Sequence, residues 1–174
     1  MKIVKNALYV VIWFLIVYFL QTSFFNYFTI AGIKPNLFII FIVFIGLNTS
    51  KYYAISIGVT VGLLIDFAIG SNIGQNAVLY GLLGYVISLI QVNISKDSRI
   101  SNVLIIFIAT LCVETLFYAG QVFLAGAVLE IKVFAKIVLI EALYNGIMLM
   151  IVYPIWKALS KSGVYDISRA ERYL

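Results

Sequence analysis

Long apolar stretches, separated by short polar segments, fill most of the chain. Six such stretches run over residues 7–28, 34–50, 52–69, 76–92, 101–124 and 133–156. An α-helix rises about 1.5 Å per residue and needs about 17–25 residues to cross the hydrocarbon core of a bilayer. The pattern therefore predicts an all-α integral membrane protein, a bundle of six transmembrane helices. These helices form a single transmembrane domain over residues 1–174, in which residues 157–174 are a short cytoplasmic tail.

The six stretches differ in how well they match a membrane span. The fifth and sixth are long enough, and the third and fourth reach the required length narrowly. The first is long enough if its aromatic end, Phe24 to Phe28, extends into the interface. No small-residue cleavage site follows its apolar run, where Gln21-Thr22-Ser23-Phe24-Phe25 stands instead, so we expect a permanent span rather than a signal peptide.

The second stretch is short and is flanked by Lys34 and Lys51. Both lysines can extend to the headgroups while their aliphatic stems stay in the apolar region. We expect a deeply packed helix here. The alternative is a re-entrant segment, which is tolerated only when protein surrounds it.

Composition supports the membrane class. Hydrophobic residues make up 64% of the chain and charged residues 11%, against about 25% charged residues in ordinary soluble domains. The net charge is +5, but the basic residues stand singly between apolar runs. A nucleic-acid-binding surface needs them gathered on one water-facing patch, so nucleic acid is not an expected partner.

The lysines and arginines are distributed unevenly between the two sides of the predicted bundle. Cytoplasmic segments of bacterial membrane proteins carry an excess of both residues. With the N-terminus inside, the inner segments hold nine of the 12 and the outer segments hold Lys34, Lys132 and Lys136. Both termini are therefore predicted to lie in the cytoplasm, and the protein in the bacterial cytoplasmic membrane. The nine inner residues are Lys2, Lys5, Lys51, Lys96, Arg99, Lys157, Lys161, Arg169 and Arg172.

Small residues recur every four positions in the third stretch, together with one acid, Asp66. This spacing places them on one face of a helix, where small residues allow another backbone to approach closely. The fourth stretch has a matching stripe, so the two helices are predicted to form a close hairpin around the turn at residues 70–76. Asp66 would then bond or cap that turn; the alternatives are a ligand or proton site, or a contact with a partner. The two stripes are Ala54, Gly58, Gly62, Asp66 and Gly70, then Ala77, Gly81, Gly84 and Ser88, and Gly74 and Asn76 lie in the turn.

Two further acids, Glu114 and Glu141, lie within predicted spans. An ionisable group at membrane depth is costly and rarely faces lipid. Glu114 shares a helix face with Thr110, Tyr118 and Gln121, and Glu141 shares one with Tyr144 and Asn145. We expect these faces to point inward, toward each other or toward Asp66. The resulting hypothesis is a buried polar network of Asp66, Glu114, Gln121, Glu141 and Asn145; a transport site or a partner-binding patch is the alternative.

Motifs of the common enzyme classes are missing from the sequence. The chain has no histidine, which excludes His-based triads and His metal sites. The glycines follow helix-packing spacing rather than that of a phosphate-binding loop. Asp66 is the only aspartate within a predicted span, whereas an intramembrane aspartyl protease needs two. The single cysteine, Cys112, is expected to be a small packing residue. The sequence therefore predicts no catalytic residue, no metal and no cofactor.

Several short motifs in residues 21–90 resemble the rod shape-determining protein MreD family. Length, number of spans and the predicted cytoplasmic ends agree as well. The motifs are Pro35-Asn36-Leu37 and Gly46-Leu47, then Gly62-Leu63-Leu64-Ile65-Asp66, Gly70-Ser71, Gly74, Asn76-Ala77 and Gly84-Tyr85.

The resemblance implies a membrane subunit of the cell-elongation complex that scaffolds or regulates cell-wall synthesis. Its implied partner is MreC, a single-pass protein, and through it MreB, RodA and a class B penicillin-binding protein. The sequence leaves open whether the chain forms a homodimer. Pro35, Asn36 and the glycines named above would serve helix packing or partner binding.

The family is also similar in fold to the substrate-binding subunits of energy-coupling-factor vitamin transporters, and a small-solute-binding subunit is the rival hypothesis. Such subunits often carry alanine-spaced contacts in the first helix, whereas here Val11 and Leu15 follow Ala7 at that spacing. A large cavity walled by Asp66, Glu114 and Glu141 would favour the rival, and a filled interior would favour the scaffold.

Overall fold

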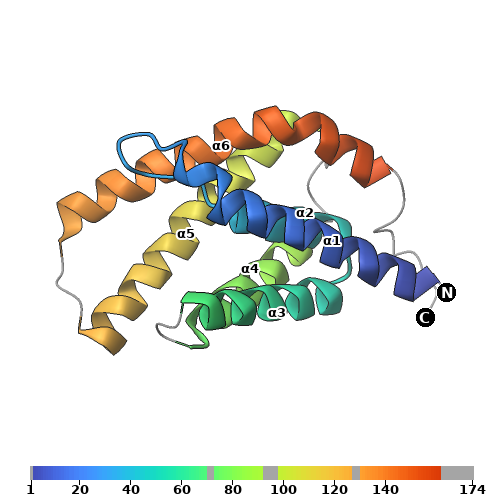
Figure 1. Ribbon diagram of the computed structural model, residues 1–174, viewed down its shortest axis with the longest axis horizontal. Coiled ribbons are helices and arrows are strands. Elements are labelled where there is room, and N and C mark those ends of the chain that lie inside the picture. The colour runs from blue at the N-terminus through green and yellow to red at the C-terminus, as the bar shows by residue number, and fades with distance from the viewer. Residues whose placement is uncertain (1, 70–72, 92–97, 127–129, 162–174) are drawn as a thin grey trace.

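The computed structural model is all-helical and describes residues 2–69, 73–91, 98–126 and 130–161. Six α-helices and one short 3-10 helix follow one another in these ranges (Figure 1). Helix α1 begins at the end of the bundle where α2 ends and α3 begins. The helices are α1 (Lys2–Thr22), η1 (Phe24–Asn26), α2 (Leu37–Asn48), α3 (Lys51–Ile69), α4 (Gln75–Ile90), α5 (Arg99–Ala125) and α6 (Ile131–Lys161).

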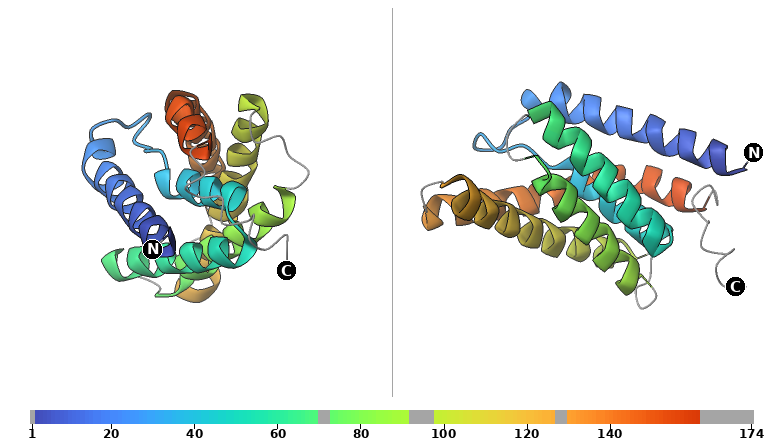
Figure 2. Two further views of the ribbon diagram at one scale, coloured as in Figure 1. Left: turned by 90° about the vertical axis from the view of Figure 1, so that its right-hand side faces the viewer. Right: turned by 90° about the horizontal axis from the view of Figure 1, so that it is seen from below.

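Helix α2 forms the centre of the bundle. All 12 of its residues are buried, and Figure 2 shows it enclosed by the other helices. Asn36 caps the start of the helix, because its side chain accepts a hydrogen bond from the Ile39 N–H. Twelve residues extend over about 18 Å, less than the roughly 30 Å of a hydrocarbon core. The structure therefore agrees with a short, deeply packed helix and makes α2 three residues shorter at its start than the apolar stretch 34–50.

Helices α3 and α4 form a tightly packed antiparallel pair. A methyl group on Gly58 would collide with the Tyr80 carbonyl, and one on Gly62 with the backbone of Ala77. From the other side, a methyl group on Gly81 would lie 2.7 Å from Val59 Cγ2. The two backbones can approach this closely only where the residue between them has no Cβ atom. The small-residue stripes thus lie where the two backbones meet.

Helices α5 and α6 make the second antiparallel pair and cross above α2 (Figure 1). Near their connection the rings of Tyr118 and Phe134 stack with centroids 4.2 Å apart. The Tyr118 hydroxyl accepts a hydrogen bond of 2.7 Å from the Glu130 N–H, which ties the start of α6 to α5. Helix α6 continues to Lys161, so it extends into the segment that the hydropathy pattern assigns to the tail.

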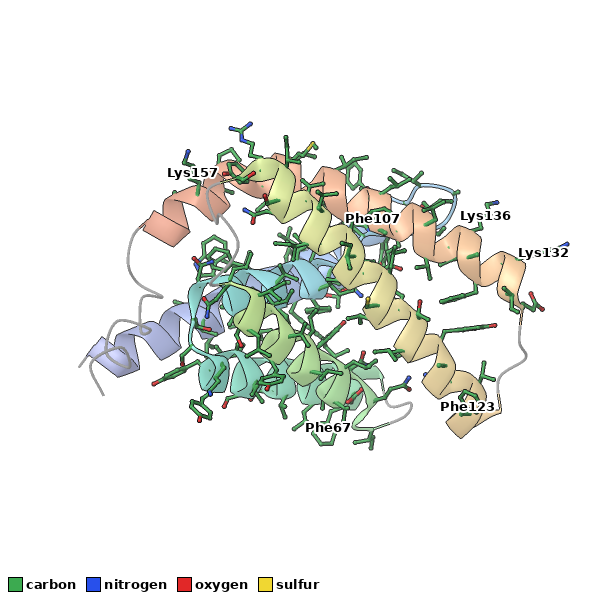
Figure 3. The ribbon with its side chains drawn as sticks, turned by 180° about the vertical axis from the view of Figure 1, so that it is seen from behind. Phe67, Phe107, Phe123, Lys132, Lys136 and Lys157 are labelled. Carbon is green, nitrogen blue, oxygen red and sulfur yellow. The ribbon has the colours of Figure 1, made fainter. Side chains whose placement is uncertain are left out.

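Three helices in the described part of the chain are long and apolar enough to cross a membrane. The windows concerned are Lys51–Ala68, Arg99–Phe123 and Ile131–Ile155. The apolar parts of α1, α2 and α4 are shorter. Large apolar side chains point away from the bundle, such as Phe67 and Phe123, which are 66% and 85% exposed (Figure 3). An outer surface of this kind suits lipid rather than water, which agrees with a membrane protein.

Candidate functional site

The Asp66 side chain binds the N-terminus of α4. Its Oδ2 accepts hydrogen bonds from the N–H groups of Gly74 (2.9 Å) and Ala77 (3.2 Å). Its Oδ1 accepts from the Asn76 N–H (3.2 Å) and from Asn76 Nδ2 (2.8 Å). The first N–H groups of a helix have no partner within the helix, and the helix dipole favours a negative charge beside them. Asp66 therefore caps α4 from the neighbouring helix, with only 2% of its own surface exposed.

Asn36 joins three helices at the start of α2. Its backbone N–H donates to Asn145 Oδ1 of α6 (2.7 Å), and its Nδ2 donates to Glu114 Oε1 of α5 (3.2 Å). Asn145 in turn donates from Nδ2 to Thr110 Oγ1 (2.9 Å). Asn145 and Thr110 are both completely buried. Because these groups satisfy one another, the cluster stabilises the crossing of α2, α5 and α6.

Gln21 of α1 holds the other side of this junction. Its Nε2 donates to the Pro35 carbonyl (2.9 Å), and its Oε1 accepts from the Leu37 N–H (2.8 Å). Leu37 begins α2, so this N–H has no acceptor inside the helix. One amide side chain thus pairs two backbone groups that would otherwise be buried without partners.

A separate pair of glutamines connects α4 to α5. Gln121 Nε2 donates to Gln75 Oε1 (3.1 Å), and Gln75 Nε2 donates to the Phe117 carbonyl (2.6 Å). The sequence alone places Gln121 on the Glu114 face, but the structure gives it a partner at the start of α4. Its side chain is half-buried.

A cavity of about 530 Å³ lies between the starts of α2 and α4 and the facing parts of α5 and α6. Glu114, Glu141, Asn36, Asn76 and Tyr80 contribute polar groups to its wall. Glu141 is 9% exposed. Its carboxyl group interacts with the carboxyl group of Glu114 and with the side chain of Asn36. The remaining wall is mainly aromatic and aliphatic: Tyr18, Gln21, Thr22, Gly32, Ile33, Lys34, Pro35, Phe38, Ile65, Ala68, Val113, Phe117 and Ile137.

The five residues of the hypothetical polar network fall into three groups in the structure. Asp66 bonds to the start of α4, Gln121 bonds to Gln75, and only Glu114, Glu141 and Asn145 meet at Asn36. Gly70 lies outside the described residues. Gly74 immediately precedes α4 with a left-handed φ of +99°, which favours glycine.

Sequence reasoning did not single out Gln21 or Tyr80 as site residues. Gln21 had a signal, because it is the one amide among the apolar residues that end α1. Tyr80 had none, since a tyrosine in an apolar helix is ordinary; only the fold brings its buried ring to the cavity wall.

The chemistry open to this region is recognition rather than bond making. Within the described ranges no three His, Cys, Asp or Glu side chains gather as a metal site would need. The cavity offers two carboxyl groups, the side-chain amides of Gln21, Asn36 and Asn76, and aromatic rings, and no activated nucleophile among the described residues.

A family model described as rod shape-determining protein MreD matches residues 1–162 of the chain. The match covers all of the described helices and extends well beyond the motifs of residues 21–90. No curated protein and no solved structure matches the sequence.

Proposed function

Since the chain belongs to the MreD family of rod shape-determining proteins, we propose that it is a subunit of the bacterial cell-elongation complex that acts through an MreC-like single-pass partner. The family is one of non-catalytic, multi-pass membrane proteins, so the chain is not an enzyme. The family match is the observation that carries the proposal. Through this partner the chain would associate indirectly with MreB, RodA and a class B penicillin-binding protein.

The proposed orientation places both termini in the cytoplasm. Lys132 and Lys136 lie at one end of α6 and Lys157 at the other (Figure 3). Lys51 and Arg99 each begin a helix at the same end as Lys157. Arg99 lies over the Tyr153 ring at 4.7 Å, an arrangement suited to an interface where charged and aromatic side chains meet.

A partner helix would need a lateral groove, because lipid gives little hydrophobic drive between helices and close packing must supply the affinity. The α4–α5 groove, a cavity of about 410 Å³, is suitable. Ala109 and Val113 are buried at its base, while Ile108 and Leu116 are exposed along its side. It is lined by Leu79, Leu82, Leu83, Val86, Ile87, Ile90, Ile105, Ile108, Ala109, Cys112, Val113 and Leu116.

We assign the partner's transmembrane helix to this groove. Small side chains at Ala109 and Cys112 let a backbone come close, and the larger ones on either side can interdigitate with the partner's side chains. A second groove, between α1 and α6 above α2, is smaller at about 230 Å³ and has Trp13 and Phe44 in its wall. This α1–α6 groove serves as the comparison site in experiments on the α4–α5 groove.

Depletion of the protein tests the proposal. Rod-shaped cells should become rounded or swollen, and an MreC-like protein should co-purify with the chain from native membranes in mild detergent. Re-expression of the unchanged chain should restore the rods. Normal rods after depletion, with loss of uptake of one nutrient, would contradict the elongation role.

The second candidate, a small-solute-binding subunit of a transporter, has one observation in its favour. The interior contains a large cavity, and two of the three intramembrane acids, Glu114 and Glu141, line it. The third, Asp66, is engaged at the start of α4 and lies outside the cavity lining. The nutrient-uptake arm of the depletion experiment separates this candidate from the first.

A further inference from the structure

The cavity beneath the 27–36 loop has the size and shape of a ligand site. Its volume of about 530 Å³ falls within the roughly 300–1,000 Å³ of small-molecule pockets. Thr22, Gly32 and Lys34 are exposed along its opening, whereas Phe38 and Tyr80 are buried deeper in it. It therefore runs from the loop end of the bundle into the interior.

The carboxyl groups of Glu114 and Glu141 have few donors. Asn36 Nδ2 donates to Glu114 at 3.2 Å, and the groups that act on the Glu141 carboxyl are Glu114 and Asn36. No lysine or arginine in the described part of the chain is among the groups that act on either carboxyl. Two acids within a membrane-embedded cavity are costly without a cation beside them.

The walls around these acids suit an organic cation better than a metal ion. Tyr18, Phe38, Tyr80 and Phe117 contribute aromatic rings, and ring faces attract ammonium groups. No third His, Cys, Asp or Glu side chain of the described residues joins Glu114 and Glu141, as a metal site would need. Aliphatic side chains such as Ile65 and Val113 complete the wall. Such an apolar wall suits the carbon atoms of an organic ligand better than a hydrated metal ion.

A positive charge stands at the opening. Lys34 is exposed, and its Nζ donates one hydrogen bond, to Asn26 Oδ1 at 3.2 Å. An ammonium carries three donors, so Lys34 retains donors for an anionic group. The cavity thus has acids in its interior and a base at its rim.

We propose that this cavity binds the primary ammonium group of a zwitterionic ligand between Glu114 and Glu141, with the anionic group of the ligand at Lys34. The ligand is an amine with a phosphate or carboxylate a few bonds away. Two sources share this chemistry: the headgroup of phosphatidylethanolamine and a free zwitterion such as phosphoethanolamine. This site stands on the geometry of the cavity alone and requires neither the partner nor the elongation role.

The first test uses the unchanged protein in nanodiscs made of phosphatidylcholine. Phosphatidylethanolamine is titrated into the discs, or phosphoethanolamine into the buffer, and the thermal melting temperature and native mass spectra are recorded. A rise in melting temperature with retained phosphatidylethanolamine assigns the lipid, and a rise with phosphoethanolamine assigns the free zwitterion. No response to either probe would overturn the proposal.

Amide variants locate the site. Glu114→Gln and Glu141→Gln keep the side-chain shape and remove the charge, so each should weaken retention of the ammonium probe by about tenfold or more. Lys34→Gln should weaken binding of phosphoethanolamine but leave that of ethylamine unchanged.

Glu130→Gln is the matched control, because Glu130 is exposed and lies outside the cavity lining. Equal loss in Glu130→Gln and Glu141→Gln would overturn the assignment, and elution as a single species on gel filtration confirms that each variant is folded.

Discussion

Asp66 Oδ1 accepts hydrogen bonds from both the backbone N–H and the side-chain amide of Asn76, at 3.2 and 2.8 Å. The two residues come from different helices, and Asn76 lies in the first turn of α4, the helix that Asp66 caps. With the bonds from Gly74 and Ala77 to Oδ2, the carboxylate satisfies four donors at one helix end. The sequence left three roles open for Asp66: a helix cap, a ligand or proton site, and a partner contact. The four hydrogen bonds favour the cap.

Asp66→Asn should destabilise the protein, because an amide keeps one acceptor oxygen and turns its NH2 group toward backbone donors. Leaving such donors unpaired costs about 1–3 kcal/mol. The measurement is thermal melting in detergent, supported by abundance in membranes. Glu130→Gln serves as the control for removal of a carboxylate from an exposed position. An unchanged melting temperature for Asp66→Asn would mean that the four bonds contribute nothing to stability.

Gly62→Ala should be strongly destabilising, since the added methyl group would collide with the backbone of Ala77. Overpacking of this kind costs about 1–3 kcal/mol or more, and Gly62→Leu should cost still more. Gly146→Ala is the matched control, because its methyl group would lie 3.4 Å from Val103 Cγ1, where that side chain can adjust. Similar melting temperatures for Gly62→Ala and Gly146→Ala would show that α3 and α4 are not packed as tightly as described.

Ile108→Trp should disrupt partner binding without disrupting the fold. Ile108 is 57% exposed and lines the α4–α5 groove, so a larger ring there fills the space that a helix would enter. Co-purification of the MreC-like protein should fall severalfold while abundance stays the same. Leu143→Trp, at a 54% exposed position on α6 outside the grooves, is the control. Loss of the partner only on substitution of Ile16, in the α1–α6 groove, would move the site there.

Cysteine labelling in intact cells checks the orientation. In a Cys112→Ser background, Lys132→Cys should react with a membrane-impermeant reagent and Lys157→Cys should not. Both positions are exposed and lie at opposite ends of α6 (Figure 3). Both should react once the cells are permeabilised. Reaction of Lys157→Cys in intact cells would reverse the predicted topology.

Local patterns determine several features of this protein. The length of the apolar stretches predicts where the helices lie. A segment within lipid has no water to pair its backbone N–H and C=O groups, so it must pair them internally, as a helix does. Four-residue spacing predicts that Gly58 and Gly62 share one face, and the structure places that face against α4. The motifs of residues 21–90 suggested the MreD family, and the family model matches residues 1–162.

Tertiary structure decides which apolar helix faces protein and which faces lipid. Helix α2 is apolar on every side and wholly buried, whereas Phe67 and Phe123 are equally apolar and exposed. Hydropathy cannot separate the two cases, since lipid and a protein interior favour the same side chains. Periodicity also assigns a residue to a face but not to a neighbour. Asn36 therefore meets Glu114, 78 positions away, and Asn145, 109 positions away, only because the chain folds back on itself.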